Sequence, residues 1–331
     1  MDHNIVDEHQ LQLCRDLSEE LNSWKLLAFN QCHDGSVIFL MVQEDIQYYK
    51  IWHLNVENGY SCEVKISKDD LKYECSWNHV DTLPNDRFLV VACRCTRYSD
   101  GSTDFNGRIF DKAGNLLRQL LLGDGIEDIK TDKDGFIWAS YFDEGIFGNF
   151  GWNHPEIIGS HGLVKWNDQG CKVYEYMPTD NDLQPIDDCY SINVVDENDV
   201  WICYYSQFPF VKISNLTINN YWLHELKSVY IRAIHGDTLL AQKCYVKEPI
   251  FFLLQLGSEK SAVKCLRTLQ FTDENEYYLN CYSPTLDIHK AWNYSTTMIK
   301  NRRLKADFIT LKTDLLISTE RYRNCSEKRV N

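Results

Sequence analysis

Short apolar runs alternate with acidic, glycine-containing turns along most of the chain. The clearest example is DIKTDKDGFIWASYFDEGIF at residues 128–147, where two apolar runs flank a turn that contains Asp132, Asp134 and Gly135. Alternation of apolar and polar residues with a period of two is typical of β-strands, and an Asp-Gly pair supplies the positive φ angle of a tight turn. The pattern therefore predicts a β-hairpin around this turn, with its acidic residues serving the turn itself.

The same pattern returns at residues 191–210, which read SINVVDENDVWICYYSQFPF. Both segments contain a strand, an acidic turn, an apolar residue, a tryptophan, two further residues and a pair of aromatic residues. The aligned pairs are Trp138 with Trp201, Tyr141 with Tyr204, and Phe142 with Tyr205. This alignment indicates an internal repeat, in which aromatic residues at equivalent positions pack between neighbouring units.

Fainter copies of the unit have turns at residues 34–35, 85–86 and 236–237, and further candidate strands begin at Leu269 and Asp307. Successive turns lie about 38 to 64 residues apart, which is typical of one four-stranded sheet per repeat. We therefore predict one all-β domain over residues 1–331, a β-propeller of six or seven four-stranded blades within residues 24–331. A strand from HQLQLCRDL, in the closing segment 1–23, is expected to join the C-terminal strand and close the ring. A pair of β-sandwiches would not predict the repeated D-x-D-G-x-I-W unit.

The unit DKDGFIWASYFDEGI, residues 132–146, resembles the propeller repeat of two-component regulators and, more distantly, NHL and WD40-type blades. The longer string at residues 123–152 resembles a family of uncharacterised bacterial propeller proteins, as do DCYSINV and CYYSQFPFVKI. The resemblance covers most of residues 24–212 and implies the propeller fold. It implies no established reaction, and this chain lacks the kinase segments that accompany the sensor type.

Composition narrows the classes of partner. The formal net charge is −14 and the sequence pI is about 5.2, which disfavours nucleic acid because binding to phosphates needs lysine and arginine. No apolar run is long enough to span a membrane, and the N-terminal residues are acidic and polar, so we expect neither a membrane segment nor a secretory signal. The thirteen cysteines form no CxxC pair, and we predict reduced cysteines in a cytoplasmic protein.

Propeller geometry places the candidate site. The segment before the inner strand of a blade and the segment after its second strand lie on the same face, where ligands commonly bind near the central channel. This face should carry both acidic ends of the stretch 123–149, the loop 149–156 and the start of the next blade. The candidate binding residues are Asp124, Glu127, Asp128, Asp143, Glu144, Trp152, His154, Asp187 and Asp188.

The carboxylates on this face allow more than one interpretation. Asp124, Glu127, Asp128 and Asp188 are candidate ligands for Ca²⁺ or Mg²⁺, since hard cations prefer carboxylate oxygens. Aspartates that precede propeller strands also cap backbone N–H groups, which is a purely structural role. Exposed aromatic residues on the same face are suited to stacking on a sugar or on a cationic group.

No G-x-S-x-G or H-E-x-x-H motif occurs, so the sequence contains neither the serine hydrolase nor the zincin signature. We therefore expect a non-enzymatic binding or scaffold protein that recognises a protein or a small ligand through the acidic and aromatic face. The alternative is a hydrolase, lactonase or lyase that depends on a divalent metal held by carboxylates at the channel mouth.

Overall fold

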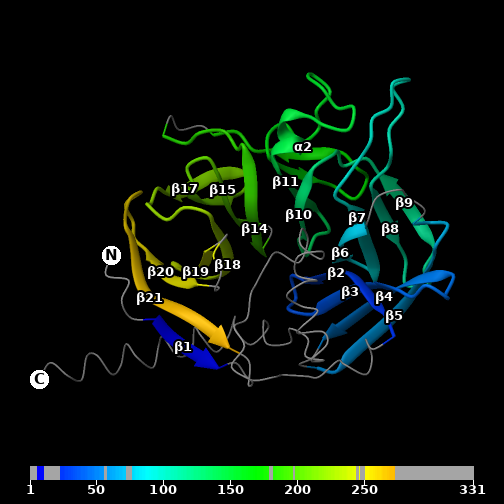
Figure 1. The fold of residues 1–331 in the computed structure, drawn as a ribbon, viewed down its shortest axis with the longest axis horizontal. Helices are drawn as coiled ribbons and strands as arrows, with labels where there is room; N and C mark the ends of the chain where they lie inside the picture. Colours follow the sequence, from blue (N-terminus) through cyan, green and yellow to red (C-terminus); the bar gives the residue numbers. More distant parts are fainter. Residues whose placement is uncertain are drawn as a thin grey trace, which may run out of the picture.

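Four sheets of four antiparallel strands each follow one another along the chain in a computed structural model, which describes residues 6–10, 23–55, 58–71, 77–178, 182–196, 198–243, 246 and 250–272 (Figure 1). Within each sheet the strands lie in sequence order. Their bounds are β2 Lys25–Gln31, β3 Val37–Val42, β4 Tyr48–Asn55 and β5 Tyr60–Ser67; β6 Trp77–Leu83, β7 Arg87–Ala92, β8 Gly107–Phe110 and β9 Leu116–Leu120; β10 Ile126–Thr131, β11 Ile137–Tyr141, β12 Leu163–Trp166 and β13 Lys172–Glu175; β14 Asp188–Asp196, β15 Asp199–Tyr205, β16 Phe210–Ser214 and β17 Thr217–Trp222.

A fifth sheet contains an additional strand from the N-terminal region. Its antiparallel strands are β18 (Val229–His235), β19 (Thr238–Lys243), β20 (Phe251–Leu256) and β21 (Val263–Thr272). Strand β1 (Val6–Gln10) pairs with β21 in parallel and forms the outer edge of this sheet. A short helix, α2 (Asp143–Phe147), follows β11. No helix within the described ranges is long and apolar enough to cross a membrane.

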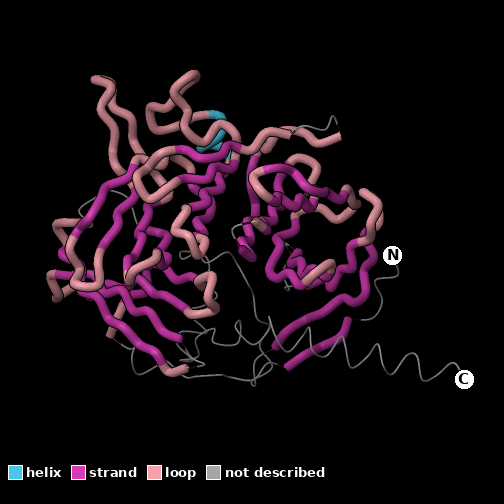
Figure 2. Tube along the Cα trace, turned by 180° about the vertical axis from the view of Figure 1, so that it is seen from behind, coloured by secondary structure: helices cyan, strands magenta, loops and turns pink. Residues whose placement is uncertain are grey.

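The five sheets follow an arc, and their first strands β2, β6, β10, β14 and β18 lie toward its centre (Figures 1 and 2). Each of these inner strands contacts the next along the arc, from β2 to β18. Buried apolar clusters fill the spaces between consecutive sheets. One joins the first two sheets, one extends from the second sheet to the fourth, and one joins the fourth to the fifth. Stacking of neighbouring sheets therefore forms the core, as in a propeller.

The predicted repeat is present at equivalent positions of the third and fourth sheets. Trp138 and Trp201 are both buried on the second strand, and each lies opposite a lysine of the third strand. The two lysines, Lys165 and Lys212, place their ammonium groups 5.0 and 5.3 Å from the indole centroids. Both tryptophans also belong to buried apolar clusters that span neighbouring sheets, as the alignment predicts.

Two details of the predicted architecture are corrected. The described residues form five sheets, not six or seven, and among them no strand pairing joins the first sheet to the fifth, so closure of the ring is not shown. The N-terminal strand includes residues 9 and 10 of the predicted closing segment and pairs in parallel with β21, the last strand that the structure describes, at the outer edge of the fifth sheet. The candidate strand at Asp307 lies outside the described residues, and of the candidate that begins at Leu269 only residues 269–272 are described, at the end of β21.

Candidate functional site

The two acidic ends of the stretch 123–149 meet on one face of the molecule. The loop before β10 contacts the beginning of α2, and the backbone N–H of Phe142 donates a hydrogen bond to the carbonyl oxygen of Gly125 at 2.9 Å. A Cβ atom on Gly125 would lie 2.3 Å from the Cα atom of Gly145. Glycine at both positions therefore allows the loop and the helix to touch, which brings the carboxylates of both segments to the same face.

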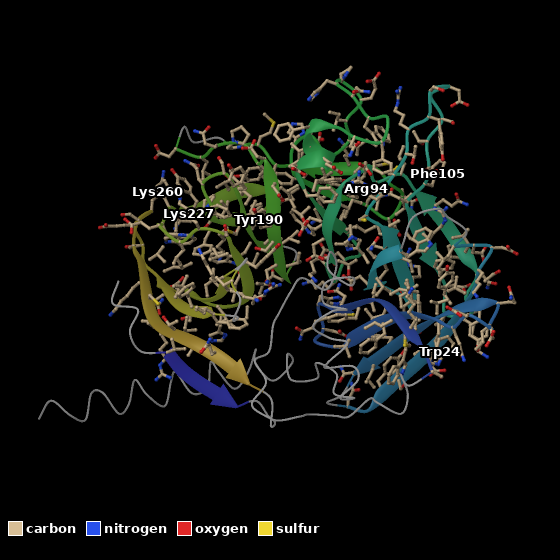
Figure 3. All side chains as sticks on the ribbon, viewed as in Figure 1. Trp24, Arg94, Phe105, Tyr190, Lys227 and Lys260 are labelled. Atoms are coloured by element: carbon tan, nitrogen blue, oxygen red, sulfur yellow. The ribbon has the colours of Figure 1, made fainter. Side chains whose placement is uncertain are left out.

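Arg94 neutralises two of the predicted site residues. Its guanidinium lies 3.1 Å from the carboxylate of Asp124 and 2.6 Å from that of Glu144. Asp124 also accepts a hydrogen bond from the backbone N–H of Cys95 at 2.8 Å. In Figure 3 Arg94 lies between α2 and the sheet β6–β9. The ion pairs of Arg94 with Asp124 and Glu144 thus connect the second sheet to the third.

Burial nevertheless raises the pKa of Asp124 to about 6, against the opposing effects of the Cys95 N–H group and Arg94. The sequence analysis missed Arg94, whose only signal was a basic residue between two cysteines. Its distance from Asp124 depends on how two sheets pack, which a local pattern does not contain.

Three other carboxylates, from three different elements, lie near one another. Glu127 lies on β10, Asp188 begins β14, and Asp143 begins α2. Burial raises the pKa of Glu127 well above its usual value, and the carboxylates of Asp188 and Asp128 add to this rise. Burial raises the pKa of Asp188 to about 7, and the nearby Asp143 contributes. Within the described part of the chain, neither a hydrogen bond nor an ion pair reaches the Asp188 carboxylate.

Positive charges border this group on two sides. Arg232 of β18 opposes the rise in the pKa values of Glu127 and Asp128. Asp128 itself accepts a hydrogen bond from the N–H of Ile129 at 2.8 Å and lies 3.7 Å from the ammonium group of Lys130. Asp128 therefore belongs to a structural network at the centre of the arc, although burial still raises its pKa.

Aromatic side chains lie beside the carboxylates at this end of the fourth sheet. Tyr205 is directly opposite Asp188 in the β14–β15 pairing and is 47% exposed. Its ring lies 5.7 Å from that of Phe208, and the ring of Phe208 lies 5.3 Å from that of Tyr190. Tyr190 in turn stacks on Tyr230 of β18 at 5.6 Å. We call this surface the acidic–aromatic face and define it by Glu127, Asp143, Asp188, Tyr190, Tyr205 and Phe208.

The remaining predicted residues have other surroundings. Trp152 is buried against Cys95 and Ile157, and its indole N–H donates to the carbonyl oxygen of Cys95 at 2.7 Å. His154 is exposed in the same loop, and Asp187 is half-buried next to Asp188. Trp152 therefore stabilises the base of the loop, whereas His154 and Asp187 lie near the surface. Tyr190, Phe208, Tyr230 and Arg232 were missed by the sequence analysis.

Metal ligands of a suitable type gather elsewhere. Across the described ranges, one group of three side chains has ligand atoms that all lie within 4.8 Å of one another, and it consists of Cys32, Asp34 and His53. None of the four carboxylates predicted to bind Ca²⁺ or Mg²⁺ belongs to that group. A carboxylate-bound metal on the acidic–aromatic face stays a prediction.

Solved structures similar to this chain share little sequence with it. A protein of unknown function from Bacteroides caccae is 11% identical, with a TM-score of 0.40, and the match covers 74% of this chain and 81% of that one. The extracellular domains of a one-component system and of a hybrid two-component system, both from B. thetaiotaomicron, are 11% and 13% identical with TM-scores of 0.42 and 0.40.

These two matches cover 76% and 77% of this chain but only 31% and 32% of the other chains. No curated protein matches the chain in sequence. Residues 171–266, from the turn before β13 into β21, match the model of the YxzG family, so less than half of the chain is similar to that family.

Proposed function

We propose that this protein is a non-enzymatic binding module that recognises a cationic group of a protein or small ligand through its acidic–aromatic face. The observation that supports this most directly is the Asp188 carboxylate. It is half-buried, it lies near the carboxylates of Glu127 and Asp143, and no described side chain pairs with it. A bound cation would supply the missing partner.

The electrostatics of the face favour a positively charged ligand. Burial raises the pKa values of Asp188 and Glu127, and repulsion from neighbouring carboxylates adds to the rise. An ammonium or guanidinium group placed between the two carboxylates would relieve that repulsion. It would also stabilise the ionised form of each carboxylate. The exposed ring of Tyr205 offers a π-face for the same cation.

The chemistry of the face also argues for the class of ligand. A net charge of −14 opposes association with the phosphates of nucleic acids and with anionic lipid headgroups.

We propose a cytoplasmic location on the strength of the cysteine usage, because the eight described cysteines are all free thiols. The metal-dependent hydrolase gains no specific support, since its four carboxylates do not converge as ligands in the described residues.

The proposal can be tested with short peptides that carry lysine, arginine or trimethyllysine at one position, with glutamine at that position as the reference. We expect the protein to bind at least one cationic series above the glutamine reference in isothermal titration calorimetry. Asp188→Asn should weaken that binding by about tenfold to a hundredfold, because a hydrogen bond to a charged group contributes about 1.5–3 kcal/mol.

Asp237→Asn is the matched control. Asp237 is exposed in the β18–β19 turn, which follows the end of β18, whereas Asp188 lies at the beginning of an inner strand. Asp237→Asn should bind the peptides as the unmodified protein does. Equal affinity for cationic and glutamine peptides, or undiminished binding by Asp188→Asn, would contradict the proposal.

A further inference from the structure

A thiol, a carboxylate and an imidazole converge at the first hairpin of the sheet β2–β5. Cys32 and Asp34 belong to the turn between β2 and β3, and His53 lies on β4. One ligand atom from each lies within 4.8 Å of the others. Cys32 is buried, His53 is half-buried and Asp34 is exposed, so the cluster opens to solvent on the side of Asp34.

Ser36 holds two of these groups in place. Its hydroxyl donates to Oδ1 of Asp34 at 2.5 Å and lies 2.6 Å from Nε2 of His53. Its backbone N–H also donates to Oδ1 of Asp34 at 2.9 Å. The carboxylate and the imidazole therefore already face a common point before any ligand binds.

The equivalent turn of the third sheet contains a charged pair at this position. In that turn Asp132 makes two backbone hydrogen bonds, to Phe136 and to Gly135, and Cys32 makes the same two bonds to Ser36 and Gly35. The Asp132 carboxylate lies 3.1 Å from the ammonium group of Lys165, and both side chains are almost fully buried. Cys32 thus occupies the position of a buried anion.

His53 occupies the position of the matching cation. Lys165 lies opposite Trp138, and His53 lies opposite Ile38; Trp138 and Ile38 each follow their turn glycine by three residues. The first sheet therefore replaces a buried carboxylate–ammonium pair with a thiol and an imidazole. A nearby carboxylate, Asp34, completes a set of one sulfur, one nitrogen and one oxygen ligand.

We propose that Cys32, Asp34 and His53 bind one Zn²⁺ ion. Bond lengths of about 2.0–2.3 Å to nitrogen, oxygen and sulfur place tetrahedral ligands roughly 3.3–3.7 Å apart, so the observed cluster needs only small side-chain movements. A thiolate and a carboxylate balance the two positive charges of the ion, which suits a partly buried position. Three protein ligands leave the fourth coordination position to a water molecule or to the hydroxyl of Ser36.

Burial acts in opposite directions on two of the ligands. Burial lowers the pKa of His53, which favours the neutral imidazole that coordinates metals. Burial raises the pKa of the Cys32 thiol well above its usual value, so zinc must displace a proton from it. A bound ion would link the β2–β3 turn to β4.

Cobalt provides a spectroscopic probe of the site. We expect one equivalent of Co²⁺, added to the reduced and metal-free full chain, to produce a near-ultraviolet thiolate-to-cobalt charge-transfer band that Zn²⁺ then removes. Cys32→Ser should abolish the band, whereas Cys171→Ser should retain it, because Cys171 is exposed in the distant β12–β13 turn. His53→Asn and Asp34→Asn should keep the thiolate signal but weaken cobalt binding at least about tenfold.

The chain has thirteen cysteines, so the test depends on whether the charge-transfer band comes from Cys32 or from another cysteine. No band in the unmodified protein, or a band that persists in Cys32→Ser, would overturn the proposal. Circular dichroism of the metal-free variants checks that each one is folded. If Cys32→Ser does not fold, the Asp34→Asn and His53→Asn variants provide the test instead. Undiminished cobalt affinity in both variants would refute the site.

Discussion

Burial without a partner distinguishes Asp188 from the other aspartates around it. Asp124 lies against Arg94, and Asp132 is fully buried but pairs with Lys165. The charged neighbour that acts on Asp188 is another carboxylate, Asp143, and burial raises the pKa of Asp188 from 3.8 to about 7. The ionised form of this single residue is therefore disfavoured in the folded protein near neutral pH.

This pKa predicts a pH-dependent loss of stability. Between about pH 4 and pH 7 the folded protein holds a proton on Asp188 that the unfolded chain has released, so stability due to this group falls as the pH rises through that interval. Replacing Asp188 by asparagine should remove the effect. From pH 5 to pH 8 the free energy of unfolding of the unmodified protein should fall by about 1–2 kcal/mol more than that of Asp188→Asn, after a discount for partial exposure.

Urea denaturation at the two pH values measures this difference. Asp237→Asn serves again as the control, because an exposed turn aspartate should leave the pH dependence unchanged. Parallel pH dependence in the unmodified protein and in Asp188→Asn would show that the Asp188 carboxyl is not protonated in the folded state.

At the scale of elements, the contact between the β10 loop and α2 assembles the face. Gly125 has a φ angle of +71° and lies against Gly145 so closely that no side chain fits between them. The helix has only five residues, too short to be stable alone, so its position depends on this contact. Asp143 and Glu144 are thereby placed beside the carboxylates of the loop.

Gly125→Ala should separate the loop from the helix and lower stability. The new Cβ atom would lie 2.3 Å from the Cα atom of Gly145, and backbone would have to move. Gly59→Ala is a matched control, because Gly59 has a similar φ angle of +73° with nothing within 4 Å of the added atom. We expect Gly59→Ala to cost about 1 kcal/mol and Gly125→Ala roughly 2 kcal/mol more in urea denaturation, since overpacking adds to backbone strain.

Equal losses in the two variants would mean that the loop and α2 move apart without cost. In that case the acidic–aromatic face would not depend on the glycine contact.

The repeat elements were predictable because their determinants are local. The period of two, the turn residues around Gly135 and the aligned tryptophans together indicate the strands and their inward faces before any packing is known. The acidic ends of the stretch 123–149 were also placed correctly on one face, because the hairpin fixes which strand ends lie together. The pairing of Asp124 with Arg94 was not predictable, since it joins two different sheets.

At the scale of the whole molecule, the sheets form an arc whose last sheet is extended by β1. This strand pairs with β21 over residues 6–10, in parallel, although nearly the whole chain separates the two strands. An uncovered β21 would present unpaired backbone N–H and C=O groups at a sheet edge, which promotes association with other strands. We therefore expect β1 to protect the fifth sheet.

Removal of residues 1–10 should lower the melting temperature and cause concentration-dependent self-association. Light scattering coupled to size-exclusion chromatography measures the association, and thermal unfolding followed by circular dichroism measures the stability. Removal of residues 1–5 alone is the control, because it leaves β1 intact. If both truncated chains stay equally stable and unassociated, β1 does not protect the edge.

The sequence by itself determined the all-β class, the repeated four-stranded unit, the residues that form its turns and the surface where the acidic ends meet. These features follow from side-chain alternation and turn chemistry, which act over a few residues. Only the tertiary structure decided the number of described sheets, the place of β1, the neutralisation of Asp124 and the convergence of Cys32, Asp34 and His53. Those depend on strand register and on packing between sheets, which bring together residues that no local pattern connects.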